Sequence, residues 1–153
     1  MSPPKYQEIS HDNMGTYNLP DGKGVVEIIA GEFKDVKGPA FTFTPMDVYN
    51  ARLKKGTSLE LSFPSNFNTG ILMVEGIADI NGSVVHSDHF VLFKNDGESI
   101  QITTDEDSVM LVLSGESINE PIAQYGPFLM NTWQELEQAI EDVNAGKFGV
   151  LED

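Results

Sequence analysis

The chain has 153 residues, of which 40% are hydrophobic and 9% aromatic, and it carries nine Lys and Arg against 24 Asp and Glu. This length is typical of a single domain with one core. The formal charge of −15 argues against direct binding to nucleic-acid phosphates or anionic lipid heads, and no apolar run approaches the roughly 20 residues of a membrane-spanning helix.

The first residues, MSPPKYQEIS, lack the charged start and apolar stretch of a secretory signal. The chain contains no cysteine, so it can form neither a disulfide nor a thiolate metal site. We therefore expect a cytoplasmic protein.

Short apolar stretches between turn residues predict β-strands along most of the chain. Residues 58–63 (SLELSF) alternate between polar and apolar side chains, as do Ile100 and Gln101, which is the period of a strand with one polar face. Residues 71–74 (ILMV) and 109–113 (VMLVL) are apolar without interruption, which predicts central strands covered on both faces.

Turn signals separate these stretches. Asp21-Gly22, Asn81-Gly82 and Asp96-Gly97 tolerate the positive φ angles of tight turns, and Gly56 and Gly76 mark further breaks. Eight or more short strands with one helical stretch predict an all-β fold, a cupin-like jelly roll or related β-sandwich with one C-terminal α-helix.

The helix is predicted at the end of the chain. Thr132 and Glu135 have the spacing of a capping box, whose loss typically costs about 1 kcal/mol. Apolar residues follow at helical spacing, namely Trp133, Leu136, Ala139, Ile140 and Val143, and Gly146 is placed to end the helix. This apolar face packs either on the chain's own sheet or on a partner domain, and the sequence leaves both open.

The closing segment also carries a family resemblance. Glu120-Pro121-Ile122, the stretch YGPFLMNT at 125–132, Asp142 and the stretch GKFG at 146–149 resemble the carboxyl-terminal signature of the pirin family. Further matches extend the resemblance over almost the whole chain, namely Pro4, Tyr6, Gln7, Gly31, Gly38-Pro39, Pro45 and residues 72–76. It covers only half of a pirin.

The resemblance implies a two-domain cupin family, with two β-sandwich domains in tandem and an iron site of histidines and a glutamate in the first. Some members resemble quercetin 2,3-dioxygenases, and others act as nuclear transcription cofactors. This chain resembles the second domain alone. We accordingly expect residues 1–20 to form a post-linker segment, 21–124 the cupin-like sandwich, and 125–153 the Gly-Pro turn and C-terminal helix.

A mononuclear cupin metal site requires two histidines one residue apart, then a glutamate and a distant histidine. The corresponding stretch, NFNTG at 66–70, has neither imidazole nor carboxylate, and Glu75 beside Gly76 fits a structural turn. The weak candidates are His86 and His89, with Asp88 between them, but positions three apart on a strand point to opposite faces. His11 lies in a polar segment. We expect no cofactor in this chain, with iron confined to the N-terminal domain of two-domain relatives.

No pattern of a catalytic nucleophile, phosphate-binding loop or catalytic carboxylate pair is visible, so no catalytic residue is assigned and enzyme activity stays open. A sandwich interior can also bind a small apolar ligand. The aromatic and apolar residues that either line such a cavity or fill the core are Phe41, Phe43, Tyr49, Phe63, Phe67 and Met73.

Three functions are compatible with these patterns. The first is a non-catalytic pirin-like domain with a structural or protein-binding role, and the second is part of a quercetin 2,3-dioxygenase whose metal site lies in an absent N-terminal cupin domain. The third is a small-molecule carrier. For the first we expect a homo-oligomer or docking to an N-terminal cupin domain, and the residues of the closing segment assigned to it are Tyr125, Gly126, Pro127, Thr132, Trp133, Glu135, Leu136 and Ile140.

Overall fold

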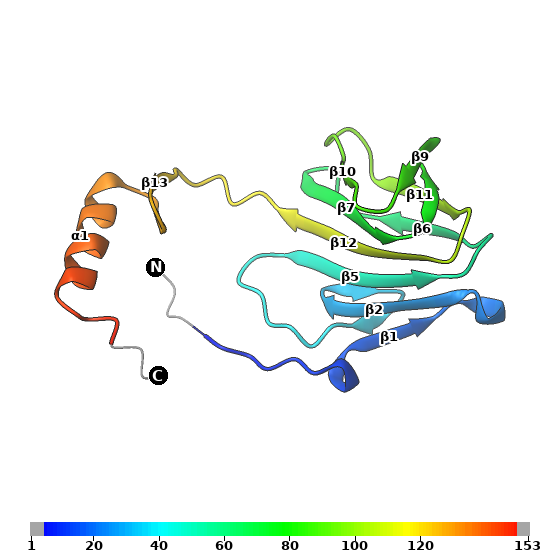
Figure 1. The fold of residues 1–153 in the computed structure, drawn as a ribbon, viewed down its shortest axis with the longest axis horizontal. Coiled ribbons are helices and arrows are strands. Elements are labelled where there is room, and N and C mark those ends of the chain that lie inside the picture. Colours follow the sequence, from blue (N-terminus) through cyan, green and yellow to red (C-terminus); the bar gives the residue numbers. More distant parts are fainter. Residues whose placement is uncertain (1–4, 150–153) are drawn as a thin grey trace. The chain divides into compact units, whose positions relative to one another are not determined.

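The structure, a computed structural model, describes residues 5–149 and consists mostly of antiparallel β-strands (Figure 1). The chain divides into two compact units, one up to Ser117 and one from Ile118 onward. The predicted all-β fold with one C-terminal α-helix is confirmed. No helix in the described part of the chain has the length and apolar character needed to cross a membrane.

The first unit is a sandwich of two sheets. The larger sheet has the order β1-β2-β5-β12-β7-β10, and the smaller has the order β6-β11-β8-β9 (Figure 1). The strands of the larger sheet are β1 (Gly15–Asn18), β2 (Gly24–Ala30), β5 (Met46–Leu53), β7 (Phe67–Glu75), β10 (Phe90–Leu92) and β12 (Ser108–Glu116). Those of the smaller sheet are β6 (Ser58–Ser62), β8 (Ile77–Ile80), β9 (Ser83–His86) and β11 (Ser99–Thr104).

Shorter elements complete the first unit. The hairpin of β3 (Glu32–Phe33) and β4 (Val36–Lys37) follows β2, and two 3₁₀ turns, η1 (His11–Asn13) and η2 (Pro20–Gly22), flank β1. Because β1 pairs with β2, the predicted N-terminal segment 1–20 contributes an edge strand to the sandwich.

The core lies between the two sheets. Alternate residues point inward from each strand, as the period of two requires. In β6, Leu59 and Leu61 are buried while Ser58, Glu60 and Ser62 are exposed. The larger sheet contributes buried residues including Val26, Ile28, Tyr49, Ala51, Leu53, Ile71, Met73, Met110 and Val112.

Gly76 marks the point where the chain leaves the larger sheet for the smaller one. It separates β7 from β8 and has φ +84°, and a Cβ at this position would lie 2.4 Å from the carbonyl oxygen of Asp107. Glycine is therefore required here by both backbone conformation and space. The predicted break at Gly76 is thus a crossing between sheets.

The second unit consists of the hairpin β13 (Ala123–Tyr125) and β14 (Phe128–Met130) followed by α1 (Trp133–Asn144). The predicted capping box is present: Glu135 N donates to Thr132 Oγ1 at 3.2 Å, and Thr132 N donates to Glu135 Oε2 at 3.0 Å. Among the described residues of this unit, only Ala123, Leu136 and Ala139 are buried.

Candidate functional site

The end of the sandwich at which β7 begins is where a cupin site was sought in the sequence. Thr69 of β7 and Ser114 of β12 are direct strand partners, both buried, with their hydroxyl oxygens 2.7 Å apart. The next inward positions of the same two strands are Ile71 and Val112. Two hydroxyls followed by hydrocarbon do not match the imidazole and carboxylate ligands of an iron site.

A group of three or more His, Asp or Glu side chains able to bind a metal ion does not occur within residues 5–149. The residues of the sandwich interior therefore do not fit the iron site that the family resemblance implies for the first domain of its members.

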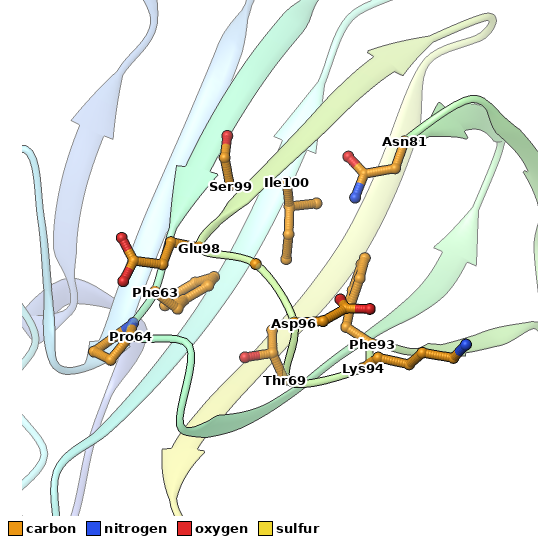
Figure 2. A pocket seen from close by; sticks show the side chains of 11 residues that line it. Phe63, Pro64, Thr69, Asn81, Phe93, Lys94, Asp96, Glu98, Ser99 and Ile100 are labelled. Carbon is orange, nitrogen blue, oxygen red and sulfur yellow. The ribbon is translucent and has the colours of Figure 1, made fainter.

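The pocket at this end is small. It measures about 80 Å³, and Figure 2 shows its walls, which include Phe63, Thr69, Phe93 and Ile100. Polar loop residues such as Asn81, Lys94 and Asp96 complete the rim. Because sites for drug-sized ligands occupy roughly 300–1,000 Å³, this pocket is too small for a multi-ring substrate.

The six residues considered for a cavity occupy three environments. Tyr49, Phe63 and Met73 are buried in the core, and Phe67 is half-buried at the start of β7. Phe41 and Phe43 are 56% and 62% exposed and form an edge-to-face pair, with ring centroids 5.2 Å apart. The structure therefore does not bring the six together around one cavity.

The Phe41 and Phe43 loop is attached to the N-terminal segment. The amide of Gln7 makes two 2.8 Å hydrogen bonds with the backbone of Phe41, one to its oxygen and one from its nitrogen. Lys5 Nζ lies 4.4 Å from the centre of the Phe41 ring, a distance typical of a cation–π contact. The segment is thus fixed to the loop by polar contacts that sequence patterns do not reveal.

His86 and His89 lie close together, although a regular strand would place them on opposite faces. His86 ends β9, Asp88 adopts a positive φ of 64°, and His89 precedes β10, so the chain turns between the two rings. Their ring centroids are 6.4 Å apart, and His89 Nδ1 lies 2.9 Å from the carbonyl oxygen of Ser87. As noted, no third ligand joins them in the described part of the chain.

A buried carboxylate on β2 was not singled out in the sequence. Glu27 Oε2 accepts a hydrogen bond from Asn50 Nδ2 at 2.5 Å, and Oε1 lies 2.7 Å from His11 Nε2. Arg52 Nε is 3.5 Å from the same carboxylate. Burial alone would raise the pKa of Glu27, but the hydrogen bonds from Asn50 and His11 and the charge of Arg52 outweigh it and lower the pKa. The cluster attaches the N-terminal segment to the larger sheet.

The two outer faces of the sandwich differ in polarity. On the smaller sheet, β6 and β11 expose only polar residues, among them Glu60, Ser99 and Gln101, and β9 adds one exposed apolar residue, Val84. On the larger sheet, neighbouring strands present an outer apolar face, which we define as Val48, Leu72, Phe90, Leu92, Leu111 and Leu113. Phe90 is 55% exposed and Leu92 72% exposed.

The residues assigned to the closing segment are mostly at the surface of their unit. Tyr125 ends β13, Gly126 and Pro127 form the turn between β13 and β14, and Thr132 caps α1. Trp133 is 65% exposed. Leu136 is buried and Ile140 is half-buried, while Glu135 serves the cap. The helix therefore has a narrow buried stripe beside a larger exposed apolar surface.

We expect the purified chain to carry well under one equivalent of iron, nickel, copper or zinc, because its interior offers hydroxyl groups and its histidine pair lacks a third ligand. Elemental analysis after dialysis measures this. The contradictory result is stoichiometric metal that survives dialysis and disappears when His86 and His89 are both replaced with alanine.

Comparison with known proteins identifies relatives along almost the whole chain. The family model described as the pirin C-terminal cupin domain matches residues 48–149. A Pseudomonas aeruginosa protein named "putative quercetin 2,3-dioxygenase" is 34% identical over 148 residues, which cover 97% of this chain and 52% of that protein. Pirin-like protein 2 of Arabidopsis thaliana is 33% identical over 97% of this chain and 49% of its own length.

A crystal structure described as quercetin 2,3-dioxygenase from Acinetobacter baumannii is similar in fold, with a TM-score of 0.92 and 36% identity. The match covers 99% of this chain and 53% of that protein. The chain thus spans about half the length of the relatives it matches.

Proposed function

Because the chain belongs to the pirin family, as its C-terminal cupin domain, we propose that it acts as a non-catalytic cupin domain that packs against another cupin domain. The family membership rests on the match over residues 48–149. The role is assigned from the surfaces and interior of the domain itself, since fold alone does not determine function.

One observation carries the proposal: the outer apolar face of the larger sheet is unlike the opposite outer face. β7 and β12 have apolar residues on both sides, yet only one side belongs to the core, where Ile71 and Val112 are fully buried. The other side presents Leu72, Leu111 and Leu113 beside Phe90 and Leu92, the two exposed residues of β10. Contiguous exposed apolar surface of this kind marks an interaction site in water-soluble domains.

The second unit supports the same role. It has three buried residues among those described, whereas Ile122, Leu129, Trp133 and Phe148 are each more than 60% exposed. Units below about 40 residues rarely bury enough surface to be stable alone. The exposed side chains of α1 therefore suit a contact with a partner.

We assign a cupin domain as the partner because the matched relatives are about twice as long as this chain. Their remaining half is long enough for one further domain of this size. A stable contact of this type buries about 800 Å², or roughly 20–30 residues, on each partner, so the six residues of the outer apolar face would form the centre of a larger contact. A separate polypeptide or an upstream part of the same polypeptide satisfies the proposal equally.

The test uses the half of the Acinetobacter baumannii protein that this chain does not cover, titrated into the chain and followed by calorimetry. We expect saturable binding that Leu113→Lys weakens by at least tenfold, because the substitution places a charge on the outer apolar face. Gln101→Lys adds the same charge to the polar outer face and is expected to leave binding unchanged. Equal binding by both variants, or a strictly monomeric chain that binds nothing, contradicts the proposal.

The names of the relatives favour a second candidate, in which the chain is one half of a pirin-like quercetin 2,3-dioxygenase. On this alternative the metal site lies in the other half, and this domain stabilises it by contact. Quercetin turnover by the metal-loaded other half, measured with and without this chain, separates the candidates. An increase on addition that Leu113→Lys abolishes favours the second candidate, and unchanged turnover despite binding favours the first.

A further inference from the structure

A second surface lies along one edge of the smaller sheet. Between this edge and the β3–β4 hairpin runs a groove with a volume of about 400 Å³. Its lining includes Glu32, Phe33, Tyr49, Glu60, Ser62 and Phe63. Its volume falls within the range of ligand sites, in contrast to the small pocket in Figure 2.

The strand that borders this groove, β6, has one free edge. In the smaller sheet β6 is terminal and pairs with β11 alone. Phe63 N donates to Glu98 O at 2.9 Å, and Thr104 N donates to Thr57 O at 3.0 Å, so the odd-numbered residues of this stretch direct their backbone groups toward β11. Because these directions alternate, Glu60 and Ser62 direct their N–H and C=O groups toward the groove.

These four backbone groups have no hydrogen-bond partner within the part of the chain that the structure describes. A strand edge of this kind is a template for another strand. The groove therefore offers the two donors and two acceptors that an extended peptide requires.

The floor of the groove is aromatic. The rings of Phe33 and Tyr49 have centroids 5.8 Å apart, and those of Tyr49 and Phe63 are 6.0 Å apart and stacked. The Tyr49 hydroxyl is occupied, since it lies 2.7 Å from Glu32 O and 2.8 Å from Asp47 Oδ1. Burial and the neighbouring Asp47 raise the pKa of this hydroxyl well above its ordinary value, so it stays protonated. Phe33, Tyr49 and Phe63 are only 8%, 3% and 6% exposed, so an incoming apolar side chain meets the edges of three largely buried rings.

We propose that an extended segment of another polypeptide, with alternating basic and apolar residues, adds to β6 as a further strand. Its apolar side chains pack on Phe33, Tyr49 and Phe63 while its backbone pairs with Glu60 and Ser62. Glu32 is already paired with Lys37, whose Nζ lies 3.5 Å from Glu32 Oε2, so the acidic group at the rim without an ion-pair partner among the described residues is Glu60. Because Glu60 lies beside the free edge and the chain as a whole carries −15, a basic segment is favoured.

Charge disfavours a second copy of this chain at the same edge, since each copy carries −15. An antiparallel pairing of two β6 strands centred on Glu60 would also place Glu60 directly opposite its counterpart, and like charges in that position are destabilising. A pairing centred on Leu61 places Glu60 opposite Ser62 instead, so the experiment below also tests for a second copy. The proposed peptide surface is also separate from the outer apolar face, so it adds a binding mode to the function proposed above.

The experiment titrates an acetylated and amidated Lys-Val-Lys-Val-Lys peptide into the full chain and follows the backbone amide signals by NMR. We expect saturable shifts centred on Glu60 and Ser62. Glu60→Gln removes the charge but retains the N–H, and it is expected to weaken binding about twofold, the order for an exposed charge pair. Glu60→Pro removes the charge and also the outward N–H, but it leaves the hydrogen bonds between β6 and β11 intact. We expect its affinity for the peptide to be about fivefold lower than that of Glu60→Gln, which is the order of magnitude for one backbone hydrogen bond.

A matched peptide keeps the proposal testable if Glu60→Pro fails to fold. Lys-Val-Pro-Val-Lys, added to the unaltered chain, lacks the central N–H and also one of the three lysine charges. A loss of affinity of about tenfold is expected, roughly fivefold for the hydrogen bond and twofold for the charge. Equal binding of the two peptides, equal affinities of Glu60→Pro and Glu60→Gln, or absence of saturable binding would overturn the proposal. So would concentration-dependent shifts of the same amides without peptide, which assign the edge to a second copy. Leu113→Lys is expected to leave peptide binding unchanged, because Leu113 lies on the outer apolar face and not beside β6. A failure of the peptide proposal can therefore be told apart from a failure of the proposed domain contact.

Discussion

Replacing Ile71 with alanine is expected to lower the free energy of unfolding by about 2–5 kcal/mol. Ile71 lies in the middle of β7, is 0% exposed, and faces the smaller sheet from a central position of the larger one. Removing three carbons there loses the transfer free energy of the side chain and leaves a cavity in a close-packed core. Urea unfolding followed by far-UV circular dichroism measures the change.

The control for Ile71→Ala is Leu113→Ala, which removes a similar volume from the other side of the same sheet. Leu113 is 37% exposed on the outer apolar face. We expect this variant to lose less than Ile71→Ala does in the isolated chain, about 1–2 kcal/mol, since more than a third of the surface of Leu113 is exposed before a partner binds. Losses of equal size in the two variants would show that the outer face is already covered within the chain, and would remove the main support for docking there.

The strand patterns in the sequence predicted the sandwich well because side-chain alternation is local information. The alternation at 58–63 corresponds to β6, and the uninterrupted apolar stretches at 71–74 and 109–113 lie in β7 and β12, which are central in the larger sheet. The prediction that both faces of these strands are covered is met on the inner face only. Their outer residues Leu72 and Leu113 belong to the outer apolar face.

The aromatic residues show where sequence reasoning fails. Phe41 and Phe43 have the same hydrophobicity as Phe63, yet Phe63 is buried and the other two are exposed. The difference depends on which segments of the chain pair through their backbones. Residues 38–45 form no strand, and the backbone of Phe41 is hydrogen-bonded to the side chain of Gln7, more than thirty residues away in the sequence. Long-range pairings of this type leave no periodic signal in the sequence.

The candidate surfaces were predictable to different degrees. The missing metal ligands are visible in the sequence because residue type alone excludes the chemistry at 66–70. The free edge of β6 was not predictable, since only the strand order of the folded sheet places β6 at an end and turns Glu60 and Ser62 toward a groove. The capping box of α1 was visible because it depends on residues three apart.

Replacing Trp133 with alanine is expected to change the free energy of unfolding of the isolated chain by less than about 1 kcal/mol and to weaken binding to a cupin partner by more than tenfold. The ring is 65% exposed at the start of α1, so its removal costs little burial within the chain. A tryptophan that becomes buried only at an interface is a common centre of binding energy. Calorimetric titration with the uncovered half of the Acinetobacter baumannii protein measures the binding.

The matched control for Trp133→Ala is Leu136→Ala, one turn further along the same helix. Leu136 is 2% exposed and is one of three buried residues described in the second unit, so its truncation is expected to melt α1 while the sandwich remains folded. Hydrogen exchange resolves the two cases, because protection should be lost in 133–144 and retained in β7 and β12. If Trp133→Ala instead destabilises the isolated chain by more than about 2 kcal/mol, the size expected for a buried ring, then the helix packs on its own domain. In that case α1 does not belong to the proposed interaction surface, and that surface consists of the outer apolar face alone.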